Sequence, residues 1–356
     1  MREVPKIYIF YSGFVSRGGG VVTHLKVVEK ALKRLEPNIV VKAYSLDNLK
    51  PFSYLLVVIE RFINLLAFPA GFILRALLSK FLWQTIVFFK KKNNNYFLFE
   101  DIYTSPQKPG GKHFLTFLHA LKSDQLYEKK PKSSSQNILL NIEKRTVARI
   151  NPVTVSYEYA SWVTNRLQLP IKVIPLGSFP EEYHIGPKEN WILIAGNLEA
   201  RKNPFFALET IKILAMNRGD FQAFFTGRGP LEIQLKKQIG NDPKIKVLGW
   251  IPKKELTDLF SRAKILLLPS KQETFGLVLL EAKYSGCFTI ASEGLTVPKD
   301  LTDLRLPLDP RLWAQKISET LDNYSPDPKE REKIISKYNA IEMANQILKE
   351  IGYEGY

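Results

Sequence analysis

Ser270 to Gly286 reads SKQETFGLVLLEAKYSG and directly follows the apolar run KILLL, which is closed by Pro269. Such a run predicts a buried strand, and the apolar residues after Gly276 predict a helix. Two acids interrupt this pattern, because Glu273 precedes the helix and Glu281 lies inside it. In an open parallel sheet, ligands bind beyond the carboxyl ends of the strands. The stretch therefore predicts a binding site on a strand-loop-helix unit.

The predicted helix is expected to begin near Thr274 to Gly276, and its free amides and positive dipole end predict an anion site. Glu281 is expected roughly two turns further in, about 8–10 Å along the axis, where it could accept hydrogen bonds from sugar hydroxyls. Glu273 could do the same for a second sugar. Two glutamates at this spacing alone usually lie on a protein surface. Here they flank an expected anion site, and a diphosphate with a sugar on either side is a nucleotide-sugar. The expected contacts come from Thr274, Phe275, Gly276, Leu277 and Glu281.

Short apolar runs alternate with helical stretches along the chain, which predicts parallel sheets built from right-handed crossover units. Two such series meet near Pro175, so we expect an α/β protein of two doubly wound, Rossmann-like domains, over residues 1–174 and 175–337. A final helix is expected within 338–356. The runs include KIYIFY, NIVVKAYSL, NYFLFEDIYTS, WILIAGNL, FQAFFTGRG, IKVLGW and CFTIAS.

The composition limits the function classes. The chain has 356 residues and a formal net charge of +16, which calls for an anionic partner. The single cysteine, Cys287, excludes an internal disulfide framework and fits a reducing compartment. The start, MREVPKIYIFYSG, does not read as a signal peptide, so a cytoplasmic protein is expected. Interleaved basic and aromatic residues typical of nucleic-acid modules are not apparent, and no nucleic-acid partner is expected.

Taken together, these stretches resemble the retaining GT-B glycosyltransferases with an E-x7-E motif, the glycosyltransferase family 4 or group 1 type. The E-x7-E pair is Glu273 and Glu281. SGFVSRGGGVVTHLKVVEKAL resembles the family's Gly-Gly loop and first helix, with Gly19, Gly20 and His24 in register. FLTFLHAL resembles the family's strand that ends in a histidine facing the donor sugar, which points to His119. AGNLEARKNPFFALETI resembles the family's phosphate-binding strand and helix. The rest of the family's second domain is similar to FTGRGPLEIQLK and VLGWIPKKELTDLFSRA.

The resemblance implies two domains that face a cleft, with the final helix packed back on the first domain. It implies a retaining, metal-independent hexosyltransferase that takes a UDP or GDP sugar and a glycan or lipid-linked acceptor, in cell-envelope polysaccharide or glycolipid synthesis. No cofactor is implied besides the donor, and no metal ligand. The implied catalytic residues are Glu273, Lys202, His119 and Arg201, and the implied donor-binding residues are Gly19, Gly20, Gly227, Thr274, Phe275, Gly276, Leu277 and Glu281.

One residue departs from the family pattern. The family has an arginine directly after the glycine of AGNLEARK, where this chain has Asn197. Arg201, beside Lys202, could supply the missing charge, or the diphosphate site could be weaker.

The sequence contains no D-x-D, so a metal-clamped glycosyltransferase fold has no support. Two other functions are compatible with the sequence. A nucleotide-sugar 2-epimerase has the same fold, and a non-enzymatic protein that binds membranes would have the same basic charge.

Residues 52–92 are unusually apolar, and the cluster Lys90, Lys91 and Lys92 closes them. The longest charge-free run, Phe62 to Leu74, is shorter than the ~20 residues that span a bilayer, and Pro69 is expected to divide two helices. Apolar helices ending in lysines predict a segment that lies on an anionic membrane, which would place the protein peripherally on the inner face of the cytoplasmic membrane. The alternative is a pair of helices buried against the first sheet.

Overall fold

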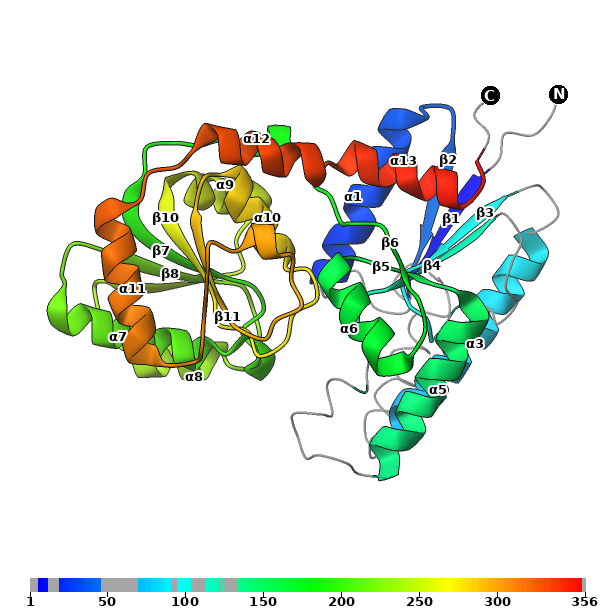
Figure 1. Cartoon of the computed structure of the whole chain (residues 1–356), viewed down its shortest axis with the longest axis horizontal. Coiled ribbons are helices and arrows are strands. Elements are labelled where there is room, and N and C mark those ends of the chain that lie inside the picture. Colours follow the sequence, from blue (N-terminus) through cyan, green and yellow to red (C-terminus); the bar gives the residue numbers. More distant parts are fainter. Residues whose placement is uncertain are drawn as a thin grey trace. The chain divides into compact units, whose positions relative to one another are not determined.

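The computed structural model describes residues 6–11, 19–45, 70–90, 95–103, 105, 113–121, 123 and 134–353 (Figure 1). The chain forms two compact units. Unit 1 comprises Met1–Gly177 and Ala340–Tyr356, and unit 2 comprises Ser178–Asn339. The predicted boundary, near Pro175, lies close to this division, and the final helix belongs to unit 1 although it follows unit 2 in the sequence.

Unit 1 contains a parallel six-stranded sheet with the order β2-β1-β3-β4-β5-β6. Its central strands are buried and apolar, as expected for a parallel sheet covered on both faces. The strands are β1 (Lys6–Phe10), β2 (Val40–Tyr44), β3 (Tyr96–Phe99), β4 (Phe114–Leu118), β5 (Val153–Thr154) and β6 (Lys172–Val173).

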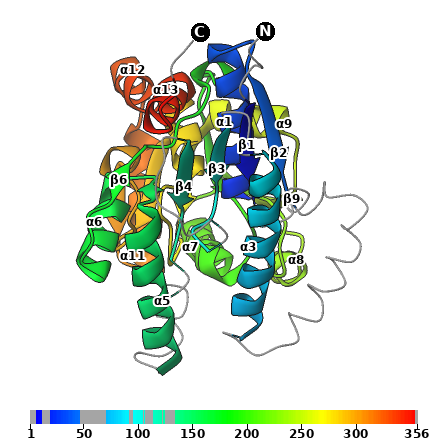
Figure 2. The ribbon, with the colours of Figure 1, turned by 90° about the vertical axis from the view of Figure 1, so that its right-hand side faces the viewer.

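The helices of unit 1 pack on this sheet or on one another. Trp83 and Val87, on α3, pack against the strand residues Phe10, Phe97 and Phe99. α3 extends past the sheet at one end (Figure 2). α13 packs on α1, and the ring of Tyr353, which follows α13, meets the Tyr96 ring of β3 edge-on. The helices are α1 (Gly20–Leu35), α3 (Ala70–Lys90), α5 (Ser134–Ile150), α6 (Tyr157–Leu167) and α13 (Ala340–Glu350).

Unit 2 contains a second parallel six-stranded sheet, with the order β12-β11-β10-β7-β8-β9. Strands β7 and β10 are central neighbours, so the loops that follow them leave the same edge of the sheet. The strands are β7 (Glu189–Ala195), β8 (Gln222–Thr226), β9 (Ile245–Gly249), β10 (Ala263–Leu268), β11 (Phe288–Ser292) and β12 (Leu304–Leu306).

The core of unit 2 is closed by α7 and α11, whose Phe206 and Trp313 rings meet edge-on with centroids 5.2 Å apart. The helices are α7 (Pro204–Asn217), α8 (Glu232–Ile239), α9 (Lys253–Arg262), α10 (Leu277–Tyr284), α11 (Pro310–Asn323) and α12 (Pro328–Lys337). Short 3-10 helices are η3 (Pro180–Glu182), η4 (Ala200–Lys202) and η5 (Lys299–Leu301).

The predicted α/β class with two doubly wound parallel sheets is confirmed. Strand β12 was not predicted, because three residues carry too short an apolar pattern to be recognised. The start of α10 was placed too early. It begins at Leu277, so Glu281 lies about one turn inside the helix and not two.

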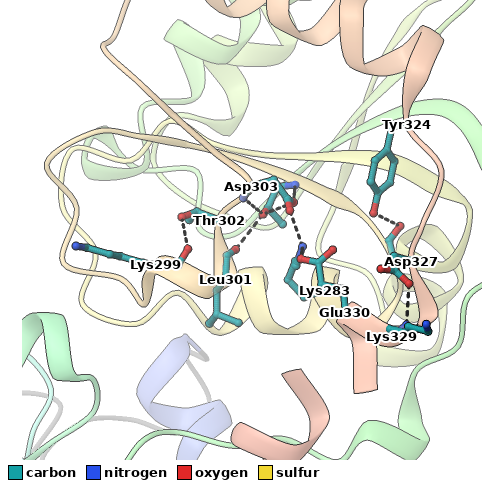
Figure 3. Close-up of polar contacts among 11 residues, drawn as sticks. Lys283, Lys299, Leu301, Thr302, Asp303, Tyr324, Asp327, Lys329 and Glu330 are labelled. Carbon is teal, nitrogen blue, oxygen red and sulfur yellow. Dashed lines mark hydrogen bonds and ion pairs between the residues drawn. The ribbon is translucent and has the colours of Figure 1, made fainter. Parts of the chain in front are cut away.

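A buried lysine ties α10 to the surrounding elements (Figure 3). Lys283, on α10, donates to Asp303 at 2.7 Å and also pairs with Glu330 on α12. Asp303 accepts from the backbone amide and the hydroxyl of Thr289, at 2.7 and 3.0 Å. Because the ammonium is buried, its two carboxylate partners are what make that burial tolerable. The cluster holds α10, and hence the loop before it, in one position.

We expect Lys283→Met to destabilise unit 2, because the change keeps the apolar stem but leaves Asp303 without its cation. Breaking a buried ion pair costs about 3 kcal/mol, the lower end of the usual range, since Glu330 remains 39% exposed. Urea denaturation measures the change. Lys329→Met, at an exposed lysine of α12, is the control and should alter stability by less than ~0.5 kcal/mol. Equal stability of the two variants would contradict the assigned role of Lys283.

Candidate functional site

The loops after β7 and β8 approach each other backbone to backbone at the carboxyl edge of the unit 2 sheet. Gly196 donates its amide to the Thr226 carbonyl at 3.1 Å. Gly227 has a φ of +117°, and a Cβ placed there would lie 1.9 Å from the Gly196 carbonyl oxygen. A side chain at Gly227 is therefore excluded twice, by conformation and by space. Gly227 is therefore required by the close contact between the two loops.

Two cations meet Glu273 beside this edge. The short helix η4 carries Arg201 and Lys202, and Lys202 forms an ion pair with the Glu273 carboxylate. Arg201 lies 3.6 Å from the same carboxylate oxygen and donates to the Gln272 carbonyl at 2.9 Å. Burial alone would raise the pKa of Glu273, but Lys202 and Arg201 outweigh it and hold the pKa below its usual value. The carboxylate is therefore ionised at neutral pH, and a second carboxylate, Glu199, pairs with Arg201 at 2.8 Å.

The loop from Glu273 to Gly276 is fixed by contacts on both sides. The Glu273 carbonyl accepts from the Thr296 hydroxyl at 3.0 Å, and the Phe275 ring is buried against the Tyr338 ring. Gly276 adopts a left-handed conformation, with φ 73°, immediately before the first residue of α10, Leu277. The first amides of a helix have no partner within the helix, so this loop presents them at the carboxyl edge of β10. Thr274, Phe275 and Gly276 thus form the loop before the helix and Leu277 begins it, and the Thr274 amide hydrogen-bonds the Glu273 carboxylate.

Glu281 is buried, unlike a surface glutamate, and it is already hydrogen-bonded. Its Oε1 accepts from the Tyr183 hydroxyl at 2.8 Å and from the Lys253 ammonium at 2.6 Å. Burial and the neighbouring Glu281 carboxylate both raise the pKa of Tyr183, so the phenol stays protonated and can only donate to this ionised partner. Neither partner is predictable from the sequence. Tyr183 lies 98 positions from Glu281, and no periodic signal connects residues so far apart.

His119 belongs to unit 1 and directly follows β4. Its Nε2 lies 2.7 Å from Oε2 of Glu100, which follows β3, and the same oxygen lies 3.0 Å from Nδ1 of His24 on α1. Gly19 precedes α1, with φ 107°, and Gly20 is its first residue. The predicted site residues thus fall into two groups. Gly19, Gly20 and His119 are in unit 1, and all the others are in unit 2.

Within the described part of the chain, His24, Glu100 and His119 are the one group whose ligand-type atoms have metal-site spacing, all within 4.8 Å of one another. Burial would raise the pKa of Glu100, but His24 and His119 lower it to about 2. An ionised carboxylate only accepts hydrogen bonds, and both contacts have hydrogen-bond lengths. In this structure His24, Glu100 and His119 therefore form a hydrogen-bonded cluster.

Comparison with known proteins identifies the domain in unit 2. Residues 178–340 match the family model described as "Glycosyl transferases group 1". A curated relative, the amylovoran biosynthesis glycosyltransferase AmsK of Erwinia amylovora, is 29% identical over 36% of this chain. The match covers 35% of AmsK, and only 30–35% of the first three curated relatives.

Solved structures match over nearly the whole chain. A sucrose-phosphate synthase from Thermosynechococcus elongatus has a TM-score of 0.69 at 16% identity, covering 97% of this chain and 98% of that one. HepE of Anabaena, in complex with UDP and glucose, has a TM-score of 0.64 at 13% identity, covering 98% and 100%. Similarity at this identity establishes the fold. The chain thus has the GT-B fold, and residues 178–340 form a domain of the glycosyl transferases group 1 family.

Proposed function

We propose that this protein is a retaining glycosyltransferase that moves a sugar from a nucleoside-diphosphate sugar to a glycan or lipid-linked acceptor. The observation that carries the proposal is the convergence of Lys202 and Arg201 on the Glu273 loop, directly before the first turn of α10. Fixed cations and helix amides stabilise the charge that develops on a leaving diphosphate. The family of the unit 2 domain, and the UDP and glucose bound by HepE, support a nucleotide-sugar as donor.

The proposed roles follow from this arrangement. Lys202 neutralises the diphosphate, the loop amides of Thr274 to Leu277 hydrogen-bond it, and Gly227 holds the loops after β7 and β8 together beside the nucleotide. Glu281 holds the ribose, and Glu273 holds the transferred sugar. Lys202 and Arg201 would neutralise the diphosphate in place of a metal ion, by exchanging their carboxylate partners Glu273 and Glu199 for phosphate oxygens. The amylovoran biosynthesis role named for AmsK favours an acceptor in cell-envelope polysaccharide or glycolipid synthesis.

Release of free nucleotide tests the reaction class. A transferase releases a nucleoside diphosphate from the donor in proportion to the acceptor, supplied as an envelope glycolipid extract. A nucleotide-sugar 2-epimerase would turn over the donor without acceptor, and a non-enzymatic basic protein would leave it intact. Nucleotide release that does not respond to acceptor would contradict the proposal.

A further proposal concerns membrane association. Part of the apolar segment, residues 52–69 together with Lys91 and Lys92, lies outside the described residues, but α3 is described. One face of α3 is buried through Trp83 and Val87. The opposite face exposes Leu77, Phe81 and Phe88, the last two to 72% each. Positions four and seven apart share a helix face, so these side chains form one apolar stripe.

The buried face of α3 fits the alternative of helices packed on the first sheet, and the exposed stripe supports a membrane contact as a proposal. None of the helices in the described ranges combines the length and the apolar character needed to cross a bilayer. We propose that the exposed stripe lies on the surface of an anionic membrane, next to Lys90 at the helix end, and brings the enzyme to a lipid-linked acceptor. The net charge of +16 supports attraction to anionic lipid.

Nucleotide binding is the first prediction of these roles. Glu281→Gln should weaken the affinity for the nucleoside diphosphate by roughly 1–3 kcal/mol, about 5- to 150-fold, because a charged acceptor for the ribose is lost. Lys202→Met should weaken it at least as much. Calorimetric titration with UDP and with GDP measures both. Glu319→Gln, on the exposed side of α11, is the control and should bind like wild type. Wild-type affinity in the Glu281 variant would remove the ribose assignment.

A second prediction addresses the missing arginine at Asn197. Arg201→Met should weaken diphosphate binding about tenfold or more, because Arg201 is the second cation next to Glu273. Asn197→Arg should restore much of that loss in the Arg201→Met background and change little in the wild type. If Arg201→Met has no effect while Asn197→Arg strengthens binding on its own, Arg201 does not compensate, although the role of Lys202 survives.

Sedimentation with lipid vesicles tests the membrane proposal. The double variant Phe81→Gln/Phe88→Gln should bind anionic vesicles at least tenfold more weakly, because two exposed rings no longer insert. Binding of the wild type should also fall as salt is raised, since the lysine contribution is screened. Met216→Gln/Ile233→Gln, which replaces two exposed apolar side chains of unit 2, is the control. A wild type that never sediments with vesicles would overturn the proposal.

A further inference from the structure

Glu100 is the most enclosed charged group around His119. Its side chain is fully buried, and it stands at the carboxyl end of β3, one strand away from the end of β4 where His119 lies. Both histidines approach the same oxygen, Oε2, at 3.0 Å from His24 and 2.7 Å from His119. Two donors on one carboxylate oxygen fix that oxygen from two directions. The position of the His119 ring is thereby tied to α1 as well as to β3.

Hydrogen-bond chemistry fixes which ring nitrogens carry hydrogen. The pKa of Glu100, about 2, keeps the carboxylate ionised, so it has no hydrogen to donate. Each ring nitrogen that contacts it must therefore donate, which places hydrogens on Nδ1 of His24 and Nε2 of His119. Burial lowers the pKa of His119 against the opposing influences of Glu100 and Asp101, so the ring is neutral at neutral pH. A neutral imidazole that carries its hydrogen on Nε2 has a lone pair on Nδ1.

His119 is the one member of the cluster with exposed side-chain surface. The His119 side chain keeps 13% of its surface exposed, whereas those of His24 and Glu100 are fully buried. Among the described residues, Glu100 is the one hydrogen-bond partner of His119. The Phe117 ring stacks on the His119 ring with centroids 5.7 Å apart, and the His24 ring meets it edge-on. These neighbours hold the ring plane in place.

The cluster is costly for a purely structural element. Nε2 of His24 and Oε1 of Glu100 are buried without a partner among the described residues. A buried polar atom without a partner is destabilising, and apolar side chains would fill the same space without that cost. Retaining a half-satisfied polar cluster at the carboxyl edge of a parallel sheet points to a functional constraint on the one exposed member.

We propose that Glu100, held by His24, is a positioning residue that locks His119 in the Nε2–H tautomer and so presents Nδ1 as a hydrogen-bond acceptor. The ligand group that fits this atom is a hydroxyl that donates its hydrogen, as on a sugar. This inference rests on the proposed function for the identity of that ligand, but the tautomer itself is a property of the free protein. His119 then recognises a hydroxyl by accepting from it, and a substrate carrying only an acceptor at that position is disfavoured.

Histidine-selective ¹⁵N labelling with long-range ¹H–¹⁵N NMR reads the tautomer directly. The chain has four histidines, and the spectrum of His119→Gln assigns the signals of His119. At neutral pH we expect a protonated Nε2 and an unprotonated Nδ1 for His119. Hydrogen on Nδ1, or fast exchange between the two tautomers, would overturn the proposal without the use of any variant of Glu100. Zinc binding at micromolar concentration that shifts both histidines would also overturn it, by making the cluster a metal site.

Substitution of Glu100 tests the positioning. In Glu100→Gln the neutral amide can donate or accept, so His119 should lose its single tautomer, and kcat should fall about 10- to 100-fold with little change in KM for the donor. Glu143→Gln is the matched control, since Glu143 is a buried carboxylate of the same unit, bound by the Tyr103 hydroxyl and the Ser123 amide. It should leave the His119 tautomer unchanged. A single Nε2–H tautomer that persists in Glu100→Gln would show that Glu100 does not set it.

The proposed function and the positioning role of Glu100 can fail independently of each other. If the protein transfers no sugar but His119 shows the expected tautomer, the proposed function fails and the positioning role of Glu100 stands. If transfer occurs but the tautomer is wrong or independent of Glu100, the positioning role fails alone.

Discussion

The ion pair between Lys202 and Glu273 is the interaction on which this account of the site depends. It joins the short helix after β7 to the loop after β10, and these two strands are neighbours in the centre of the sheet. A backbone hydrogen bond from the Lys271 amide to the Arg201 carbonyl, at 2.9 Å, is a second contact between the same two segments. Because the sheet and these contacts fix both partners, the cations and the start of α10 are organised before any ligand arrives. Such preorganisation is what makes electrostatic stabilisation effective.

Much of the fold could be predicted from the sequence, because each central strand is an uninterrupted apolar run followed by a helical pattern. KILLL and the helix after Gly276 illustrate this, and they also located Glu273 and Glu281 correctly on one strand-loop-helix unit. The start of α10 was predicted less well, since the loop before it is apolar too and Phe275 is buried like a helical residue. Periodicity alone does not separate a buried loop from the first turn of a helix.

The partners of the site residues could not be predicted, because they depend on tertiary contacts. Glu281 reads in the sequence as an isolated acid, whereas in the structure Tyr183 and Lys253 hold one of its oxygens. Glu100 gave no signal at all, although it organises both His24 and His119. Which face of α3 is exposed could not be predicted for a related reason. A helix that is apolar all round does not reveal which face packs on the sheet, and only the structure separates Trp83 from Phe81.

The central claim is that the start of α10, together with Lys202, is a diphosphate site, and a crystal structure with bound UDP or GDP tests it most directly. The account predicts phosphate oxygens within hydrogen-bond distance of the first amides of α10 and of the Lys202 ammonium, with the ribose hydroxyls on Glu281. Lys202 should then share its charge between Glu273 and the phosphates. A nucleotide bound elsewhere, with the Lys202–Glu273 pair undisturbed and the amides of α10 in contact with water alone, would contradict the account.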